Sequence, residues 1–326
     1  MALLSKLYIE KFDVWDHHAY GWPGIINYIK RFSAKNKKAS VVLEPALEYT
    51  FAQYRKKNLT KILYYEKNPW VAFAHHHPDD PRAFCRMESI INNTKNEKAI
   101  SRCQGIFVLS EKQRQCYVKI DKLKNIPVSV LYHPVYASSL KFNTKCLLKS
   151  SQTGNYPTGT VVSVGDHCRM FDKFSNLNTT MPRTVCLFQK DHWRGPRQAK
   201  RRDVALRAGG VSRYDRYYDN KTYYKMLRNN VHYAELWKPT ASNYILECIE
   251  RNIPIYVNPC DVVVEYLGND YPFYMKSSIN DMESDLNNTE LIFNAHSYLK
   301  KHPFKEKFKL KNFLHSVVNS LVYKSL

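Results

Sequence analysis

Residues 235–268 read ELWKPTASNYILECIERNIPIYVNPCDVVVEYLG, and this stretch decides the fold class. The small polar residues Ser242 and Asn243 precede an apolar pattern with helical spacing, which ends before a proline. A buried-strand run at 255–257 follows, and then a second helical pattern. Loop, helix, strand and helix in this order are typical of a Rossmann-like α/β domain.

The start of the first helix in this stretch suits a phosphate group. A loop that leads into a helix N-terminus offers backbone N–H groups and the positive end of the helix dipole. Glu247, one turn further on, is placed to accept hydrogen bonds from two sugar hydroxyls, as acidic residues do for ribose in nucleotide-binding α/β folds. Ser242, Asn243 and Glu247 therefore predict a nucleotide site. The alternative is an ordinary α/β unit with Glu247 exposed to solvent.

The bulk composition allows two folded domains. The chain has 326 residues and 44% hydrophobic content, with eight cysteines and no CxxC pair. Free thiols fit a reducing compartment. We expect no transmembrane segment and no signal peptide, because no apolar run is long enough, and hence a cytoplasmic protein.

The formal net charge of +21 favours an anionic partner. The most basic segment, residues 190–217, carries aromatic residues among its cations, which is compatible with nucleic-acid binding. A solvated charged loop is the alternative for this segment.

The N-terminal part predicts a first Rossmann-like unit. A strand at 7–15 leads into a loop with Gly24, which allows close backbone approach, and then into a helix. The same loop brings three candidate general bases for an acceptor hydroxyl: Asp16, His17 and His18. Exposed histidines of no catalytic role are the alternative.

A histidine run follows the strand predicted at 70–74. His75, His76 and His77 are consecutive, and neighbours in an extended segment point to opposite faces, so a shared metal ion is disfavoured. We predict no metal site, and take His76 as a further candidate base in a segment that lines the acceptor site.

Two domains and a returning helix are expected: 1–150, 155–300 and 301–326. The second domain begins with a strand at 161–164 and the tight-turning Gly165. Arg169 and Lys173 follow, four residues apart, so they can face the same way on the next helix or loop.

The tail carries an apolar stripe at helical spacing, namely Leu310, Phe313, Leu314, Val317, Val318 and Leu321. Such a helix packs on a domain or lies on a membrane surface.

The segment ASNYILECIERNIPIYVNPCDVVVEYLGNDYPFY, residues 241–274, resembles the nucleotide-sugar site of GT-B glycosyltransferases. It looks closest to single-chain enzymes of large DNA viruses and some bacteria. The resemblance implies two Rossmann-like domains facing a cleft, with the last helix crossing back to the first domain. It also implies transfer of a sugar from a nucleotide-diphosphate donor to a hydroxyl of a glycan or protein glycan, with Glu247 on the ribose.

Further roles follow from the same resemblance. Arg169, together with Lys173 and the helix start, holds the diphosphate, so no metal cofactor is required; a UDP-sugar is favoured over a GDP-sugar as donor. Many retaining relatives carry a second glutamate where this chain has Pro239, so the stereochemistry stays open. Two rivals remain: a DNA-base glucosyltransferase of the same fold, and an inactive GT-like binding or virion protein.

Overall fold

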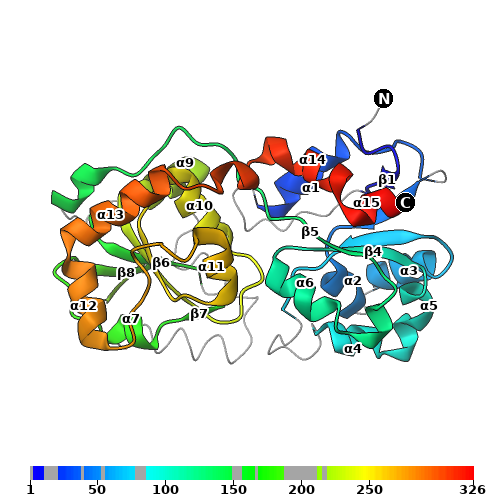
Figure 1. The fold of residues 1–326 in the computed structure, drawn as a ribbon, viewed down its shortest axis with the longest axis horizontal. Coiled ribbons are helices and arrows are strands. Elements are labelled where there is room, and N and C mark those ends of the chain that lie inside the picture. The colour runs from blue at the N-terminus through cyan, green and yellow to red at the C-terminus, as the bar shows by residue number, and fades with distance from the viewer. Residues whose placement is uncertain are drawn as a thin grey trace. The chain divides into compact units, whose positions relative to one another are not determined.

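The structure is a computed structural model that describes residues 3–10, 21–37, 40–52, 56–77, 86–148, 156–165, 168–186, 211–214 and 219–326. The chain divides into two compact units (Figure 1). Unit 1 comprises Met1–Pro134, Lys238–Ala241 and Glu306–Leu326, and unit 2 comprises Val135–Trp237 and Ser242–Lys305.

Unit 1 is built on a parallel sheet whose strands lie in chain order. They are β1 (Leu7–Tyr8), β2 (Val41–Glu44), β3 (Trp70–Phe73), β4 (Cys103–Val108) and β5 (Val128–Val130). Alternate strand residues enter two cores, as the period of a strand requires. Trp70 and Ala72 join one core, while Val71 and Phe73 join the other. Both faces of this sheet are therefore covered, which explains the continuous apolar strand WVAF.

The helices of unit 1 divide between these two cores. The first core takes residues from α2 (Leu47–Ala52), α3 (Lys56–Tyr65), α4 (Met87–Ile91), α5 (Glu97–Ile100) and α6 (Glu111–Tyr117). The second core takes residues from α1 (Trp22–Lys30), α14 (Leu310–Asn319) and α15 (Leu321–Ser325). Short 3-10 turns of this unit lie at η2 (Thr94–Asn96) and η3 (Asp121–Leu123); η4 (Thr144–Leu148) belongs to unit 2, and η6 (Lys305–Phe308) leads from unit 2 back to unit 1.

The C-terminal helices return to unit 1, as expected. Figure 1 shows α14 and α15 in red beside the blue α1. The Phe313 ring stacks on Phe73, with 6.3 Å between centroids, and Val322 packs on Gly105 of β4. The apolar stripe thus packs inside the fold and does not form a face that lies on a membrane surface. One detail differs from the expected single helix: Ser320 accepts a hydrogen bond from the Tyr323 N–H and starts a new helix, which leaves Leu321 62% exposed.

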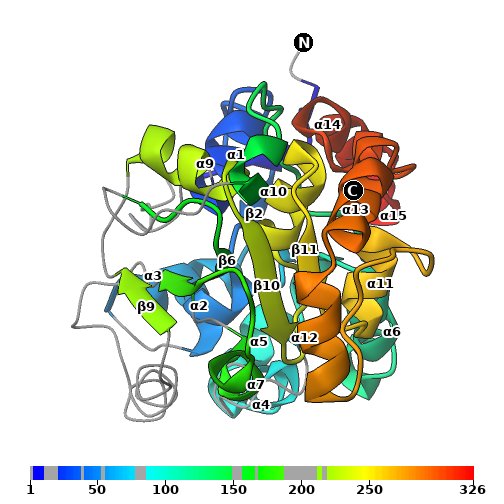
Figure 2. The same ribbon diagram turned by 90° about the vertical axis from the view of Figure 1, so that its left-hand side faces the viewer.

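Unit 2 contains a second sheet with a different strand order. The order is β11-β10-β6-β8-β9, all parallel, and a short strand β7 (Arg169–Met170) pairs antiparallel with β10. The other strands are β6 (Val161–Val164), β8 (Arg183–Cys186), β9 (Val211–Tyr214), β10 (Val231–Leu236) and β11 (Ile255–Val257). Figure 2 shows β6, β10 and β11 as neighbouring strands. Numbered along the chain, the parallel strands have the order 3-2-1-4-5 of a doubly wound fold, with its switch point between β6 and β10.

The helices of unit 2 are α7 (Asp172–Asn176), α9 (Asn220–Arg228), α10 (Asn243–Arg251), α11 (Asp261–Leu267), α12 (Ile279–Asn287) and α13 (Thr289–Lys300). Helix α10 is the helix expected from ASNYILECIE. Ser242 caps it by accepting the Ile245 N–H, and Asn252 ends it in the left-handed region with φ 57°. Every residue from Tyr244 to Arg251 is buried, so its polar side chains lie inside the unit.

Candidate functional site

The candidate site lies at the switch point of the second sheet. Open α/β sheets bind ligands beyond the carboxyl ends of their strands, at the point where the strand order reverses. Gly165 follows β6, and the segment leading into α10 follows β10. Gly165 and the start of α10 therefore lie at the place where this fold offers a binding site.

Gly165 makes the turn after β6 with φ +75°, a conformation that side chains rarely adopt. Its N–H donates to the Cys186 carbonyl at 2.9 Å, which fixes the turn to the neighbouring strand. Among the described residues, no atom lies within 4 Å of a Cβ placed on Gly165, so these residues leave the space beside the turn open. The turn therefore combines a fixed backbone with room for a ligand.

Arg169 lies in β7, directly beside β10, with only 8% of its surface exposed. Its Nε donates to the Val164 carbonyl at 3.4 Å, and its guanidinium lies 5.3 Å from the ring centre of Tyr244. Tyr244 belongs to the first turn of α10. The cation is thus held next to the positive end of the helix, an arrangement suited to a diphosphate.

Glu247 is buried in α10, with 9% of its surface exposed. Burial raises the pKa of its carboxyl to about 7, although Arg251 and a hydrogen bond from Tyr223 lower it in part. The oxygen Oε2 is buried and has no hydrogen-bond partner among the residues that the structure describes. A buried acceptor without a donor is unfavourable, so this oxygen is suited to receive the hydroxyl of a ligand.

Lys173 does not share the surroundings of Arg169. It lies in α7, whereas Arg169 lies in the short strand β7, so the two residues do not belong to one helix. Its ammonium forms an ion pair with Glu235 at 3.0 Å, and the hydroxyl of Tyr233 also donates to Glu235. A ligand phosphate would have to compete with this buried carboxylate for Lys173.

Gly24 occupies a position different from the loop expected for it. It lies in the first turn of α1, and its N–H donates to the Gly21 carbonyl at 3.0 Å. Pro23 favours this early start, because proline is well tolerated in the first turn of a helix. Gly24 belongs to unit 1, apart from the other six candidate nucleotide-sugar residues, which all belong to unit 2.

Of the candidate bases, Asp16, His17 and His18 lie outside the described residues. His76 follows β3 in unit 1, and its N–H donates to Oε1 of the buried Glu48 at 2.8 Å. The same oxygen accepts the N–H of His75 at 2.7 Å. Glu48 thereby fixes the backbone that carries the histidine run at the carboxyl end of the sheet.

The ring of the partly buried His75 is held by specific contacts. Burial lowers the pKa of its imidazole, and its Nε2 donates to the Pro45 carbonyl at 2.9 Å. The indole of Trp22 donates to the same carbonyl and packs edge-on against the His75 ring. His76, like His75, is partly buried.

Two residues of these sites, Tyr223 and Glu48, were missed at the sequence level. Tyr223 lies in NKTYYKMLR, whose pattern predicts a helix and gives no sign of a partner. Glu48 follows a strand end, but its contact with the His75–His76 backbone joins residues that are far apart in the chain. Only the fold brings these pairs together.

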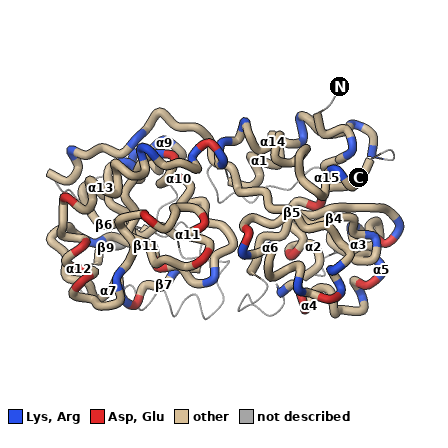
Figure 3. The backbone as a smooth tube through the Cα atoms, in the orientation of Figure 1, with Lys and Arg blue, Asp and Glu red and all other residues tan. Residues whose placement is uncertain are grey.

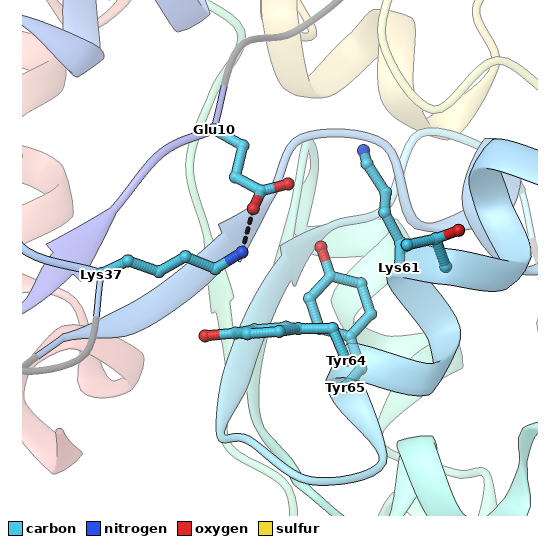
Figure 4. A pocket seen from close by; sticks show the side chains of 6 residues that line it. Glu10, Lys37, Lys61, Tyr64 and Tyr65 are labelled. Atoms are coloured by element: carbon cyan, nitrogen blue, oxygen red, sulfur yellow. Dashed lines mark hydrogen bonds and ion pairs between the residues drawn. The ribbon is translucent and has the colours of Figure 1, made fainter.

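A separate cavity of about 120 Å³ lies in unit 1 and is lined by Glu10, Lys37, Thr60, Lys61, Tyr64 and Tyr65. Figure 4 shows Lys37 pointing to Glu10 across the Tyr64 ring. Lys61 pairs with the buried Glu44 at 3.2 Å. Both lysines that line the cavity are thus paired with carboxylates.

Two further features concern metals and membranes. Within the described part of the chain, no group of three or more His, Cys, Asp or Glu side chains is arranged to hold a metal ion. Among the same residues, no helix has both the length and the apolar composition needed to cross a bilayer. Figure 3 shows basic and acidic residues interspersed over both units.

No protein-family model and no curated protein matches the sequence. Solved structures match it in fold. The chain is similar to a mutant form of TarM from S. aureus in complex with fondaparinux, alpha-GlcNAc-glycerol and UDP, with 15% identity and a TM-score of 0.58. That match covers 93% of this chain and 58% of the TarM chain, so this chain spans little more than half the length of TarM.

Two other solved structures are also similar to this chain in fold. HepE of Anabaena in complex with UDP-glucose has 11% identity and a TM-score of 0.61, covering 88% of this chain and 79% of HepE. Sucrose-phosphate synthase of Thermosynechococcus elongatus has 7% identity and a TM-score of 0.59, covering 85% of this chain and 71% of that enzyme. The fold is therefore that of the GT-B glycosyltransferases, with two Rossmann-like domains, as the sequence predicted.

Proposed function

We propose that this chain is a glycosyltransferase that moves a sugar from a nucleotide-diphosphate donor to a hydroxyl of a glycan or protein glycan. The observation that carries the proposal is the set of groups at the switch point of unit 2. An open glycine turn and a buried arginine follow β6, while α10 supplies its N-terminus and a buried carboxylate whose Oε2 has no partner among the described residues. These groups match the needs of a diphosphate followed by a ribose.

Each group takes a distinct role in the proposed reaction. Arg169 and the N-terminus of α10, at Ser242 and Asn243, stabilise the negative charge of the departing nucleoside diphosphate. Glu247 accepts hydrogen bonds from the ribose hydroxyls. Gly165 lets the backbone approach the ligand. Lys173 binds the diphosphate once its ion pair with Glu235 breaks.

UDP is the proposed nucleotide, without a metal cofactor. The similar structures of TarM and HepE are complexes with UDP or UDP-glucose, which supports this choice over GDP. Cationic side chains and the helix end supply the charge that a metal ion supplies in other transferases. The kinship with single-chain enzymes of large DNA viruses, a cytoplasmic location and nucleic-acid binding through residues 190–217 stay predictions, and most of that segment lies outside the described residues.

Titration calorimetry with UDP, GDP and CDP, with and without EDTA, tests the donor site. We expect UDP to bind most tightly and EDTA to leave its affinity unchanged. Arg169→Ala should weaken UDP binding by at least about tenfold, because the hydrogen-bonded charge pair between Arg169 and the diphosphate is lost. The matched control Lys276→Ala removes an exposed cation of unit 2 and should bind UDP normally. No heat with any nucleotide would overturn the proposed function.

The acceptor base is proposed to come from Asp16, His17, His18 or His76. Single alanine variants of these four residues separate the candidates. The base is the one whose loss lowers turnover by about a hundredfold or more while the affinity for UDP stays unchanged. If all four variants turn over normally, the base lies elsewhere.

A further inference from the structure

The cavity in unit 1 lies at the carboxyl edge of the sheet of this unit. Glu10 follows β1, and the buried Glu44 is the last residue of β2, the strand that pairs with β1. Four of the six lining residues belong to α3. Open α/β sheets bind their ligands beyond the carboxyl ends of the strands. The cavity of about 120 Å³ therefore lies at the edge of the sheet where a binding site is expected.

The side of the cavity formed by α3 is ordered by its own contacts. Lys61 and Tyr65 lie four residues apart, on neighbouring turns, and both donate to Oε2 of Glu44, at 3.2 and 2.9 Å. The N–H of Ala46 donates to the other oxygen of this carboxylate at 3.1 Å. The Tyr65 ring also stacks on Trp70, with 5.1 Å between ring centres. A ligand thus meets groups that are already in place, which lowers the entropic cost of binding.

A second ion pair lies at the rim of the cavity. Lys37 pairs with Glu10, and its ammonium lies 3.7 Å from the centre of the Tyr64 ring (Figure 4). The side chains of Lys37 and Glu10 are 32% and 35% exposed, so both remain accessible. An ammonium has three donors and a carboxylate accepts about four hydrogen bonds, so an ion pair uses only part of this capacity. A hydroxyl suits this pair, because it accepts from the ammonium and donates to the carboxylate.

The chemistry of the lining favours an uncharged ligand with both apolar and polar faces. The rings of Tyr64 and Tyr65 and the methylene stems of the two lysines are apolar, whereas the ends of the lysines are charged. Both lysines are paired with carboxylates, so an anionic ligand would be repelled by Glu10 and Glu44. An apolar ligand would cover these charges without a hydrogen bond, which is unfavourable. A ring with C–H faces and hydroxyl edges meets both demands.

We propose that this cavity binds one neutral sugar ring of a glycan. Its volume of about 120 Å³ is close to the roughly 150 Å³ of a protein cavity that holds one benzene molecule, so it is suited to a single six-membered ring. The proposal goes beyond the proposed function and does not depend on it. The lining residues belong to unit 1, whereas the donor is assigned to residues of unit 2.

Saturation-transfer-difference NMR on the full chain tests the site with the methyl glycosides of glucose, galactose, mannose and N-acetylglucosamine. We expect at least one of these neutral sugars to bind, and its signal to persist when inorganic phosphate or glucuronate is added. Titration of that sugar gives its dissociation constant. The same titration is made with Arg169→Ala, because a free sugar could also enter the donor site. Binding in the cavity should be unchanged in this variant.

Two substitutions act on the cavity itself. Lys37→Met keeps the methylene stem and removes the ammonium, so it should weaken sugar binding by at least about tenfold, as for the loss of a hydrogen bond to a charged group. Thr60→Trp places a large ring at an exposed lining position and should abolish binding by filling the space. The matched control is Lys67→Met, which removes an exposed lysine just after α3 and should bind the sugar as the wild type does. All three variants should bind UDP normally.

Three results would overturn the proposal. A wild-type protein that binds none of the four sugars has no such site. An affinity that is unchanged in both Lys37→Met and Thr60→Trp would place the sugar elsewhere on the protein. Displacement of the sugar by phosphate would show that the cavity selects anions. The donor site is judged separately by the UDP titration: a chain that binds the sugar but no nucleotide would overturn the proposed function and leave the assignment of the cavity intact.

Discussion

At the scale of single residues, Glu247 links the site to the stability of the protein. Its pKa of about 7 in the folded state exceeds the ordinary value of 4.5, and burial is the main cause. Between pH 4.5 and 7 the folded protein therefore holds more protons on this group than the unfolded chain does, so its contribution to stability falls as the pH rises through this window. Glu247→Gln removes the buried charge. We compare the free energy of unfolding of the variant with that of the wild type at each pH. This difference should favour the variant more at pH 8 than at pH 5, by on the order of 3 kcal/mol.

Urea unfolding of both proteins at pH 5 and pH 8 measures this difference. Glu250→Gln on the same helix is the control, because Glu250 is held by Lys141 and the Ser138 N–H. A difference for Glu247→Gln that is the same at both pH values would contradict the assignment of the raised pKa to this carboxyl.

The residue scale also shows what the sequence could reveal. The order of small-polar loop, helix and strand located α10 and Glu247, because capping residues and apolar spacing are local signals. The antiparallel strand at Arg169 and the ion pair of Lys173 with Glu235 depend on contacts between distant segments, and no local pattern specifies them. For the same reason the partners Tyr223 and Glu48 could not be predicted.

At the scale of elements, the packing of α15 on β4 depends on a missing side chain. A Cβ on Gly105 would lie 2.3 Å from Cγ1 of Val322, and Val322 is fully buried. Gly105→Ala should therefore push α15 away from the sheet and destabilise unit 1 by about 2 kcal/mol, as other overpacked cores are destabilised. Thermal and urea unfolding followed by tryptophan fluorescence measure the change, since Trp22 and Trp70 belong to the cores of unit 1.

A double-mutant cycle with Val322→Ala separates this clash from other effects of the glycine. Removal of the two Cγ atoms makes room for the new methyl group, so the double variant should be more stable than the sum of the single changes predicts. Strictly additive losses would show that Val322 is not the residue that Gly105 accommodates.

At the scale of the whole molecule, the two units carry different parts of the proposed function. The six residues proposed for the donor lie in unit 2, whereas His76 lies in unit 1. Unit 1 is completed by the last 21 residues, because Phe313, Leu314, Val317 and Val322 fill one of its two cores. Their removal should expose that core and unfold unit 1, since several large apolar side chains lose their partners together.

A chain that ends at Lys305 tests this separation. We expect it to lose transfer activity and to expose protease-sensitive sites before residue 134, yet to bind UDP with an affinity within a few-fold of the full chain. The control is Leu321→Ser in the full chain, because this residue is 62% exposed and its loss should change neither activity nor stability by more than about 0.5 kcal/mol. If the shortened chain folds normally but loses UDP binding, the nucleotide site requires residues of the C-terminal helices, and the assignment of the donor to unit 2 alone is wrong.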